Sequence, residues 1–201
     1  MMAAMSARLA PWLPSALPPE ARTVYRSVVA TRSQLAEVGA VVGRAGELLG
    51  PFDALLRSPA IGDAVQRVGT ALRRDSTLPR DVTETAILTV AAHWRASYEW
   101  YAHAAIAASS GLLQDDDLQR LRTGRPPEGS DTLRTTWSFV SQLVADGGVD
   151  DEVYARASAM LGERGTVELV LLVGYYALLA AVLNTFRIGT PDGVEDPFGE
   201  R

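Results

Sequence analysis

The chain has 201 residues, of which 47% are hydrophobic and 21% are charged, a composition typical of one globular domain and not of a disordered chain. Its 24 acidic and 19 basic residues give a formal net charge of -5, which argues against a nucleic-acid-binding protein because such proteins need a basic surface. The absence of cysteine excludes disulfides, thiolate nucleophiles, iron–sulfur clusters and zinc sites with cysteine ligands.

All 19 basic residues are arginine, so the chain has no lysine to form a Schiff base with a substrate. The two histidines, His93 and His103, are therefore the main side chains able to exchange protons near neutral pH. Metal binding is not expected, because these histidines and the scattered acids match no zinc-binding motif such as HExxH.

Residues 1–19 hold four prolines, at positions 11, 14, 18 and 19. Each proline removes a backbone donor and restricts the residue before it, which predicts an extended N-terminal arm. Arg8 and the prolines also interrupt the apolar stretch that an export signal requires, so we expect a cytoplasmic protein.

The rest of the sequence predicts helices, with no alternating strand pattern of useful length. The expected helical segments are 20–42, 52–57, 59–74, 81–96, 97–110, 115–121, 130–144, 150–161 and 166–186. Two of these nine segments, 52–57 and 115–121, are short. We expect an all-α bundle of about seven or eight helices over residues 20–188, followed by a loosely held tail over 189–201.

Several of these boundaries are predicted from helix caps. Asp81, followed three residues later by Glu84, has the spacing of a capping box at the start of one helix. Ser97 is a competent N-cap directly after an expected break near Ala96. Three later helices are expected to be capped by Ser130, Asp150 and Thr166.

The most apolar segment, residues 169–183, runs for 15 residues without a charge. A helix needs about 20 residues to span a bilayer. We therefore expect this segment to form a buried core helix, and we expect no membrane association.

The densest group of polar residues within apolar sequence consists of Glu84, His93, Arg95, Tyr98, Glu99, Trp100 and His103. Glu99 and His103 are four residues apart and share one face of a helix, where a carboxylate can orient an imidazole and raise its basicity. The same spacing also fits an ordinary solvent-exposed pair that contributes little to stability.

Glu84 can join this pair only if the chain reverses between the two helices. On an unbroken helix, Glu84 would lie about 28 Å from His103. A break near Ala96 would make the two helices neighbours and bring Glu84 to the face that carries Glu99 and His103.

The other polar residues have structural explanations beside functional ones. His93 stands next to Trp94 and fits a structural role, while Tyr98 and Trp100 fit packing. Arg95 is able either to bind a substrate carboxylate or to pair with one of the chain's own acids.

The segment 84–90, followed by SYEWYAH at 97–103 and closing at Gly111, resembles the carboxymuconolactone decarboxylase family of the alkyl hydroperoxidase D-like superfamily. Segments 50–59 and 168–186 resemble the first and last parts of such sequences, so the likeness covers about residues 20–188. It implies an all-α subunit that uses no cofactor and assembles as a trimer or hexamer.

The peroxidase branch of this superfamily has a glutamate, two cysteines and a histidine in a proton relay. The resemblance places Glu84 and His103 at the glutamate and histidine, whereas Ala96 and Glu99 stand at the two cysteine positions. Thiol peroxidase activity is therefore excluded, and what remains resembles the decarboxylase branch.

For this chain the resemblance implies that a small carboxylated lactone or β-keto acid loses carbon dioxide. His103 would deliver the proton to the resulting anion, with Glu99 tuning the imidazole and Glu84 orienting it. The candidate substrate-binding residues are Arg95, Tyr98, Trp100, His93 and Tyr175. His93 and the long N-terminal arm match no feature of the family.

Two alternatives remain open. One is a non-catalytic oligomeric binding protein of the same fold, whose site is closed by aromatic side chains. The other is an isomerase or dehydratase of polyketide tailoring that uses the same Glu/His pair to abstract a proton.

Overall fold

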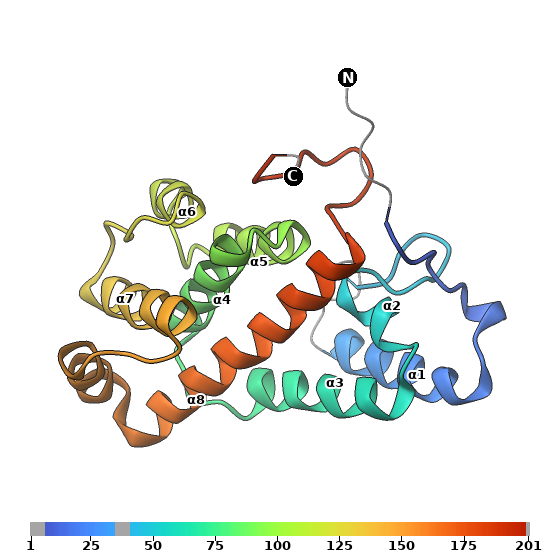
Figure 1. Cartoon of the computed structure of the whole chain (residues 1–201), viewed down its shortest axis with the longest axis horizontal. Coiled ribbons are helices and arrows are strands. Elements are labelled where there is room, and N and C mark those ends of the chain that lie inside the picture. The colour runs from blue at the N-terminus through green and yellow to red at the C-terminus, as the bar shows by residue number, and fades with distance from the viewer. Residues whose placement is uncertain (1–6, 35–40, 200–201) are drawn as a thin grey trace. The chain divides into compact units, whose positions relative to one another are not determined.

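The computed structural model describes residues 7–34 and 41–199. These residues form eight α-helices, one short 3-10 helix and no strand, so the prediction of an all-α bundle is confirmed (Figure 1). The helices are η1 (Pro14–Ala16), α1 (Pro19–Gln34), α2 (Pro51–Leu55), α3 (Pro59–Arg74), α4 (Arg80–Trp94), α5 (Ser97–Ser109), α6 (Asp115–Arg122), α7 (Asp131–Asp146) and α8 (Asp151–Phe186). Of the helix predicted over 20–42, residues 35–40 lie outside the described residues.

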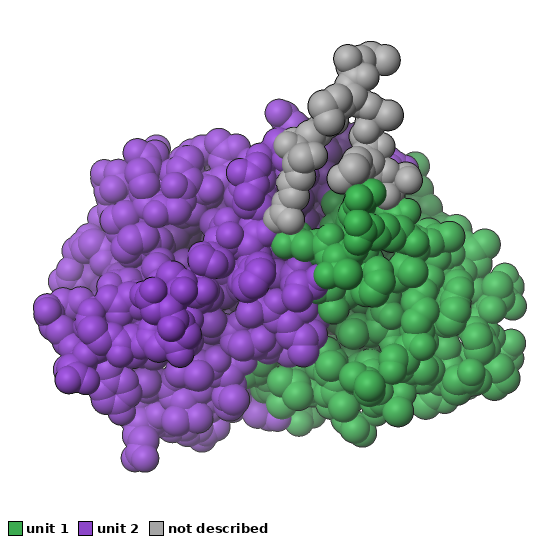
Figure 2. All heavy atoms as spheres, viewed as in Figure 1, with its two compact units in different colours: residues 1–74, 182–189 green, residues 75–181, 190–201 purple. Residues whose placement is uncertain are grey.

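The contacts divide the chain into two compact units (Figure 2). Unit 1 comprises residues 1–74 and 182–189, and unit 2 comprises residues 75–181 and 190–201. From the sequence we expect an arm over 1–19, one domain over 20–188 and a tail over 189–201. The described residues of the arm belong to unit 1, and those after residue 189 belong to unit 2.

In unit 1, the N-terminal arm is held by polar contacts; its first six residues lie outside the described residues. The backbone N–H of Trp12 donates to Oδ1 of Asp53 at 2.9 Å, and Arg57 pairs with Oδ2 of Asp53 at 2.6 Å. The Arg57 guanidinium also lies 4.4 Å from the centre of the Trp12 ring. The buried residues of this unit's core are Leu17, Ala21, Val24, Val28, Val41, Leu48, Phe52 and Leu56.

In unit 2, α4 is the central helix. It packs against α5, α6 and α7, and every residue from Glu84 to Ala91 is buried. A helix covered on all sides can be apolar around its whole circumference. A core of buried residues around α4 and α5 consists of Leu88, Ala91, Trp100, Ala107, Leu113, Leu121 and Leu133.

The predicted break between α4 and α5 is present, but its local chemistry differs from the prediction. Arg95 ends α4 in the left-handed conformation, with φ 50° and ψ 46°. Ala96 occupies the N-cap position of α5 without a side-chain hydrogen bond. Ser97 is therefore not the cap, because its hydroxyl donates to Asp196 at 2.8 Å instead.

The capping box predicted at the start of α4 is wrong. Pro79 occupies the N-cap position, so Asp81 lies two residues after the cap, and its Oδ1 accepts from the N–H of Val82. The Glu84 side chain contacts His103 rather than the start of its own helix.

Two later caps are confirmed and a third is not. Ser130 Oγ accepts from the N–H of Leu133 at 3.3 Å, and Asp150 Oδ1 accepts from the N–H of Val153 at 2.7 Å. Thr166 lies inside α8, where its hydroxyl donates to the carbonyl of Gly162 at 2.8 Å. The break predicted before Thr166 is a kink at Gly162, whose φ of 70° favours a residue without a Cβ.

By length and composition, α8 is able to cross a membrane, a property that it shares with core helices of soluble proteins. Half of its most apolar stretch is buried within the protein. On this helix, Leu169, Leu172, Val173 and Leu179 are each no more than 3% exposed.

Glu168 of α8 holds the segment that precedes α4. Its Oε2 accepts from the N–H of Thr77 at 2.7 Å and from the hydroxyls of Thr77 and Ser76, and its Oε1 accepts from Arg164 at 2.8 Å. Burial alone would raise the pKa of Glu168, but these donors together lower it to about 2.

We predict that Glu168→Gln lowers the free energy of unfolding near neutral pH. Because the folded-state pKa is below the ordinary value, this stabilisation is present above about pH 4.5 and is lost as the pH falls toward about 2. Urea unfolding at several pH values measures the difference from wild type, with the exposed Glu163→Gln as control. A difference that persists unchanged at low pH would contradict this account.

Candidate functional site

The reversal at Arg95 brings His103 of α5 to Glu84 of α4. The Nδ1 atom of His103 lies 2.8 Å from Oε2 of Glu84. Each residue is only 8% exposed, and a carboxylate in such a position requires a hydrogen-bonded partner. The structure therefore joins these two candidates, which are 19 residues apart in sequence.

The other ring nitrogen of His103 meets a residue that sequence reasoning missed. Nε2 lies 3.3 Å from the hydroxyl of Tyr176 on α8, and the two rings meet edge to face with their centres 5.2 Å apart. The sequence candidate Tyr175 is the preceding residue, and its ring packs edge-on against that of Tyr176 with the ring centres 5.3 Å apart. Both tyrosines are buried.

A signal for this contact was present in the sequence. Tyr175 and Tyr176 are consecutive in a segment without charges, and a buried phenol needs a polar partner. Neighbouring residues on a helix point about 100° apart, so the pattern indicates a polar contact but does not tell which of the two tyrosines makes it.

The geometry fixes the proton positions once Glu84 is ionised. A carboxylate only accepts hydrogen bonds, so Nδ1 of His103 carries a proton and donates it to Glu84. In the neutral ring, Nε2 then accepts, and the hydroxyl of Tyr176 is its donor. Carboxylate, imidazole and phenol thus form one chain of hydrogen bonds from α4 through α5 to α8.

Glu99 is buried with 4% exposure one turn before His103 on α5. The spacing predicts that it hydrogen-bonds the imidazole, but the partners on the two ring nitrogens are Glu84 and Tyr176. Glu99 lies in the first turn of α5, where the helix dipole favours a negative charge.

Tyr98 and Trp100 are both buried. They are 7% and 6% exposed, and Trp100 belongs to the core of unit 2 together with Leu88 and Leu113. Its ring also meets Phe198 edge to face at 5.6 Å. Neither contact involves the hydrogen-bonded chain on His103.

His93 and Arg95 are exposed at the end of α4 and are not gathered with the buried pair. The ring of His93 packs edge-on against Trp94 with centres 5.7 Å apart. Arg95 donates to the carbonyl of Phe198, and its guanidinium lies 5.8 Å from the centre of the Phe198 ring.

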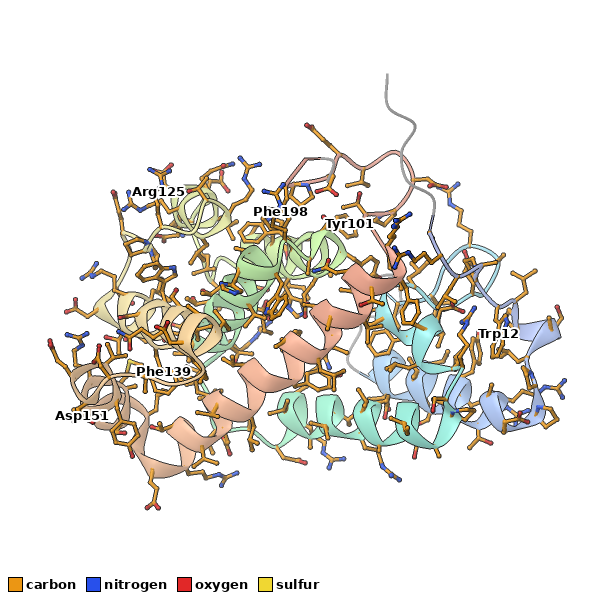
Figure 3. All side chains as sticks on the ribbon, viewed as in Figure 1. Trp12, Tyr101, Arg125, Phe139, Asp151 and Phe198 are labelled. Atoms are coloured by element: carbon orange, nitrogen blue, oxygen red, sulfur yellow. The ribbon has the colours of Figure 1, made fainter. Side chains whose placement is uncertain are left out.

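The C-terminal segment, expected to be loose, covers the start of α5; residues 200–201 lie outside the described residues. Asp196 accepts from Ser97, Arg122 donates to the carbonyl of Pro197 at 3.1 Å, and Phe198 lies near the first turn of α5 (Figure 3). These contacts hold the turn that sets the direction of α5.

Two surface grooves of unit 2 lie elsewhere. One of about 750 Å³ is lined by α7 and the first part of α8, including Trp137 and Met160. The other, of about 350 Å³, lies at residues 111–116. Glu84 and His103 line neither groove, and within the described part of the chain no group of three or more His, Cys, Asp or Glu side chains is placed to hold a metal ion.

No family model matches this chain, and a search of curated proteins finds no match. The resemblance to the carboxymuconolactone decarboxylase family therefore rests on residues 50–59, 84–111 and 168–186 of the sequence alone.

We predict different stability effects at the two histidines. His103→Gln should lower the free energy of unfolding by about 1–3 kcal/mol, because it disturbs a buried partner of Glu84 and Tyr176. His93→Gln at an exposed position should change it by no more than about 0.5 kcal/mol. Urea unfolding measures both, and equal effects would contradict the buried arrangement.

Proposed function

We propose that this protein is a cofactor-free lyase that removes carbon dioxide from a small carbonyl acid by proton transfer. The observation that carries the proposal is the buried contact of 2.8 Å between Glu84 and His103. A carboxylate that holds one nitrogen of an imidazole fixes its tautomer and stabilises its protonated form, as general acid–base catalysis requires.

The proposed reaction begins when the substrate loses its carboxylate as carbon dioxide. The electron pair of the broken bond remains on the neighbouring carbon as a dienolate-type anion, which then takes a proton supplied through His103. Glu84 offsets the positive charge of the protonated imidazole, and Glu99 adds a second negative group one turn away. Apolar surroundings favour the loss of a carboxylate, because they solvate its charge poorly.

The substrate class comes from the family resemblance. It implies a carboxylated lactone or a β-keto acid, in which the carbonyl or ring conjugation spreads the negative charge that decarboxylation leaves behind. Arg95, the sequence candidate for a second carboxylate, lies at the exposed end of α4 and donates to the carbonyl of Phe198, so the proposal gives it no role at the buried pair.

Carbon dioxide release from carboxylated lactones, β-keto acids and aromatic polyketide acids tests this proposal. We expect turnover by the wild type and a loss of about 100-fold or more in kcat for both His103→Gln and Glu84→Gln, since a general acid–base group typically contributes that much. Glu163→Gln, at an exposed position of α8, is the control.

Circular dichroism of each variant separates a lost reaction from a lost fold. Full activity of a folded His103→Gln variant would overturn the mechanism. Mass spectrometry of the product distinguishes the alternative isomerase, because isomerisation conserves mass, and a dehydratase, whose product lacks one water rather than one carbon dioxide.

A second candidate function is a non-catalytic binding protein of the same fold. The observation that favours it is the aromatic packing at the imidazole, where Tyr176 covers Nε2 and Tyr175 packs behind it. A binding protein of this kind would release no carbon dioxide from any acid in the decarboxylation screen. An acid that binds would shift the melting temperature of the protein in a saturable way.

Self-association as a trimer or hexamer is part of the proposal. Its support is an uncovered apolar face of α8, on which Val167, Val170, Leu171 and Leu178 are 54%, 42%, 57% and 41% exposed. Several large apolar side chains on one exposed helical face are typical of a contact surface.

We predict that light scattering after size exclusion gives three or six times the subunit mass of 21.5 kDa. Leu171→Glu should shift the distribution toward single subunits, because it puts a charge into the apolar contact. Ile61→Glu, which changes a residue of α3 that is 65% exposed, is the matched control. A wild-type protein whose measured mass is that of one subunit would contradict this part of the proposal.

A further inference from the structure

Both nitrogen atoms of the His103 ring are occupied by other side chains. Nδ1 lies 2.8 Å from Glu84, and Nε2 lies 3.3 Å from the hydroxyl of Tyr176. His103 is 8% exposed and Tyr176 is 3% exposed. With the imidazole held in this way, a proton that moves from Nε2 toward a bound molecule passes through the phenol.

The geometry points to Tyr176 as the residue that exchanges the proton with the substrate, with Glu84 and His103 behind it as a relay. This inference rests on the proposed function, which by itself requires only that the proton come through His103. Carboxylate, imidazole and hydroxyl follow one another as in the Ser-His-Asp triad, with a phenol in the place of the serine. The phenol acts here as a proton donor and not as a nucleophile.

The relay has two states that differ by one proton. In the neutral state, Nδ1–H donates to the ionised Glu84, and Nε2 accepts from the Tyr176 hydroxyl. In the protonated state, Nε2–H donates to the phenolic oxygen, which leaves the phenolic proton to point away from the imidazole. Only the protonated state is able to give a proton to the substrate through Tyr176.

The protons balance over one turnover. The bond to the carboxylate carbon breaks, its electron pair stays on the neighbouring carbon, and carbon dioxide leaves. The phenolic proton of Tyr176 moves to that carbon while the Nε2 proton of His103 moves to the phenolic oxygen. The neutral imidazole then takes a proton from water, so each turnover consumes one proton and restores the relay.

The relay and the ionisable groups next to it in sequence lie on three helices. Glu84 lies on α4, Glu99 and His103 lie on α5, and Tyr176 lies on α8 beside Tyr175. Tyr175 is a matched control for the hydroxyl of Tyr176. It is 5% exposed on the same helix, but it points about 100° away from its neighbour.

Nitrogen NMR of isotope-labelled histidine tests the relay without a substrate. The chain has two histidines, so His93→Gln assigns the signals. We expect the neutral imidazole of His103 to carry its proton on Nδ1 and to have no proton on Nε2. Tyr176→Phe should shift the Nε2 signal, and Tyr175→Phe should not.

Two results of this measurement would overturn the inference. One is a neutral His103 with its proton on Nε2, which reverses the direction of the relay. The other is an Nε2 signal that Tyr176→Phe leaves at its wild-type position. The tautomer is measured on the wild type, so it decides the question even if Tyr176→Phe does not fold.

The carbon dioxide assay supplies the second readout. Tyr176→Phe should lower kcat by about 100-fold or more with little change in KM, whereas Tyr101→Phe, on the more exposed side of α5, should retain wild-type kcat. Wild-type kcat in Tyr176→Phe overturns the role of Tyr176 and leaves the proposed decarboxylation standing. Absence of turnover by the wild type overturns the decarboxylation, and the NMR result then decides the relay alone.

Discussion

The hydrogen bond between Glu84 and His103 depends on one reversal of the chain. Arg95 adopts a left-handed backbone conformation that costs a residue with a Cβ about 1–2 kcal/mol. The N–H groups of Arg95 and Ala96 donate to carbonyls in the last turn of α4, which offsets part of this cost. Because the chain turns there, α5 packs against α4, and two side chains distant in sequence share one buried position.

Burial gives this contact a structural role as well as a chemical one. Glu84 lies on a helix that is buried on all sides, where an unpaired carboxylate would be strongly destabilising. The imidazole satisfies that carboxylate, and the phenol of Tyr176 satisfies the imidazole. The same three groups thus hold α4, α5 and α8 together and provide a path along which a proton is able to move.

Features decided by neighbouring residues were predictable from the sequence. Ser130 and Asp150 cap their helices through N–H groups three residues later, so their role depends on local geometry alone. The break near Ala96 was also predictable, and with it the meeting of Glu84 and His103. The pattern of apolar residues and breakers was enough for the all-α class.

Features decided by distant residues were not predictable in the same way. Ser97 would cap α5 if its hydroxyl were not bound to Asp196, 99 residues away. The choice of Tyr176 over Tyr175 depends on the rotation of α8 about its axis, which follows from packing and from the kink at Gly162. A sequence window shows which side chains need partners, whereas the fold decides which partners they find.

Because α8 bends at Gly162, the number of residues between this kink and Tyr176 determines the direction in which Tyr176 points. Residues 163–175 act as a spacer between a fixed bend and the phenol at the imidazole. One residue inserted into this spacer would turn everything after it by about 100° and carry Tyr176 away from the ring. One apolar residue in the spacer can replace another, but the number of residues must stay the same. The site therefore constrains insertions and deletions there more strongly than substitutions.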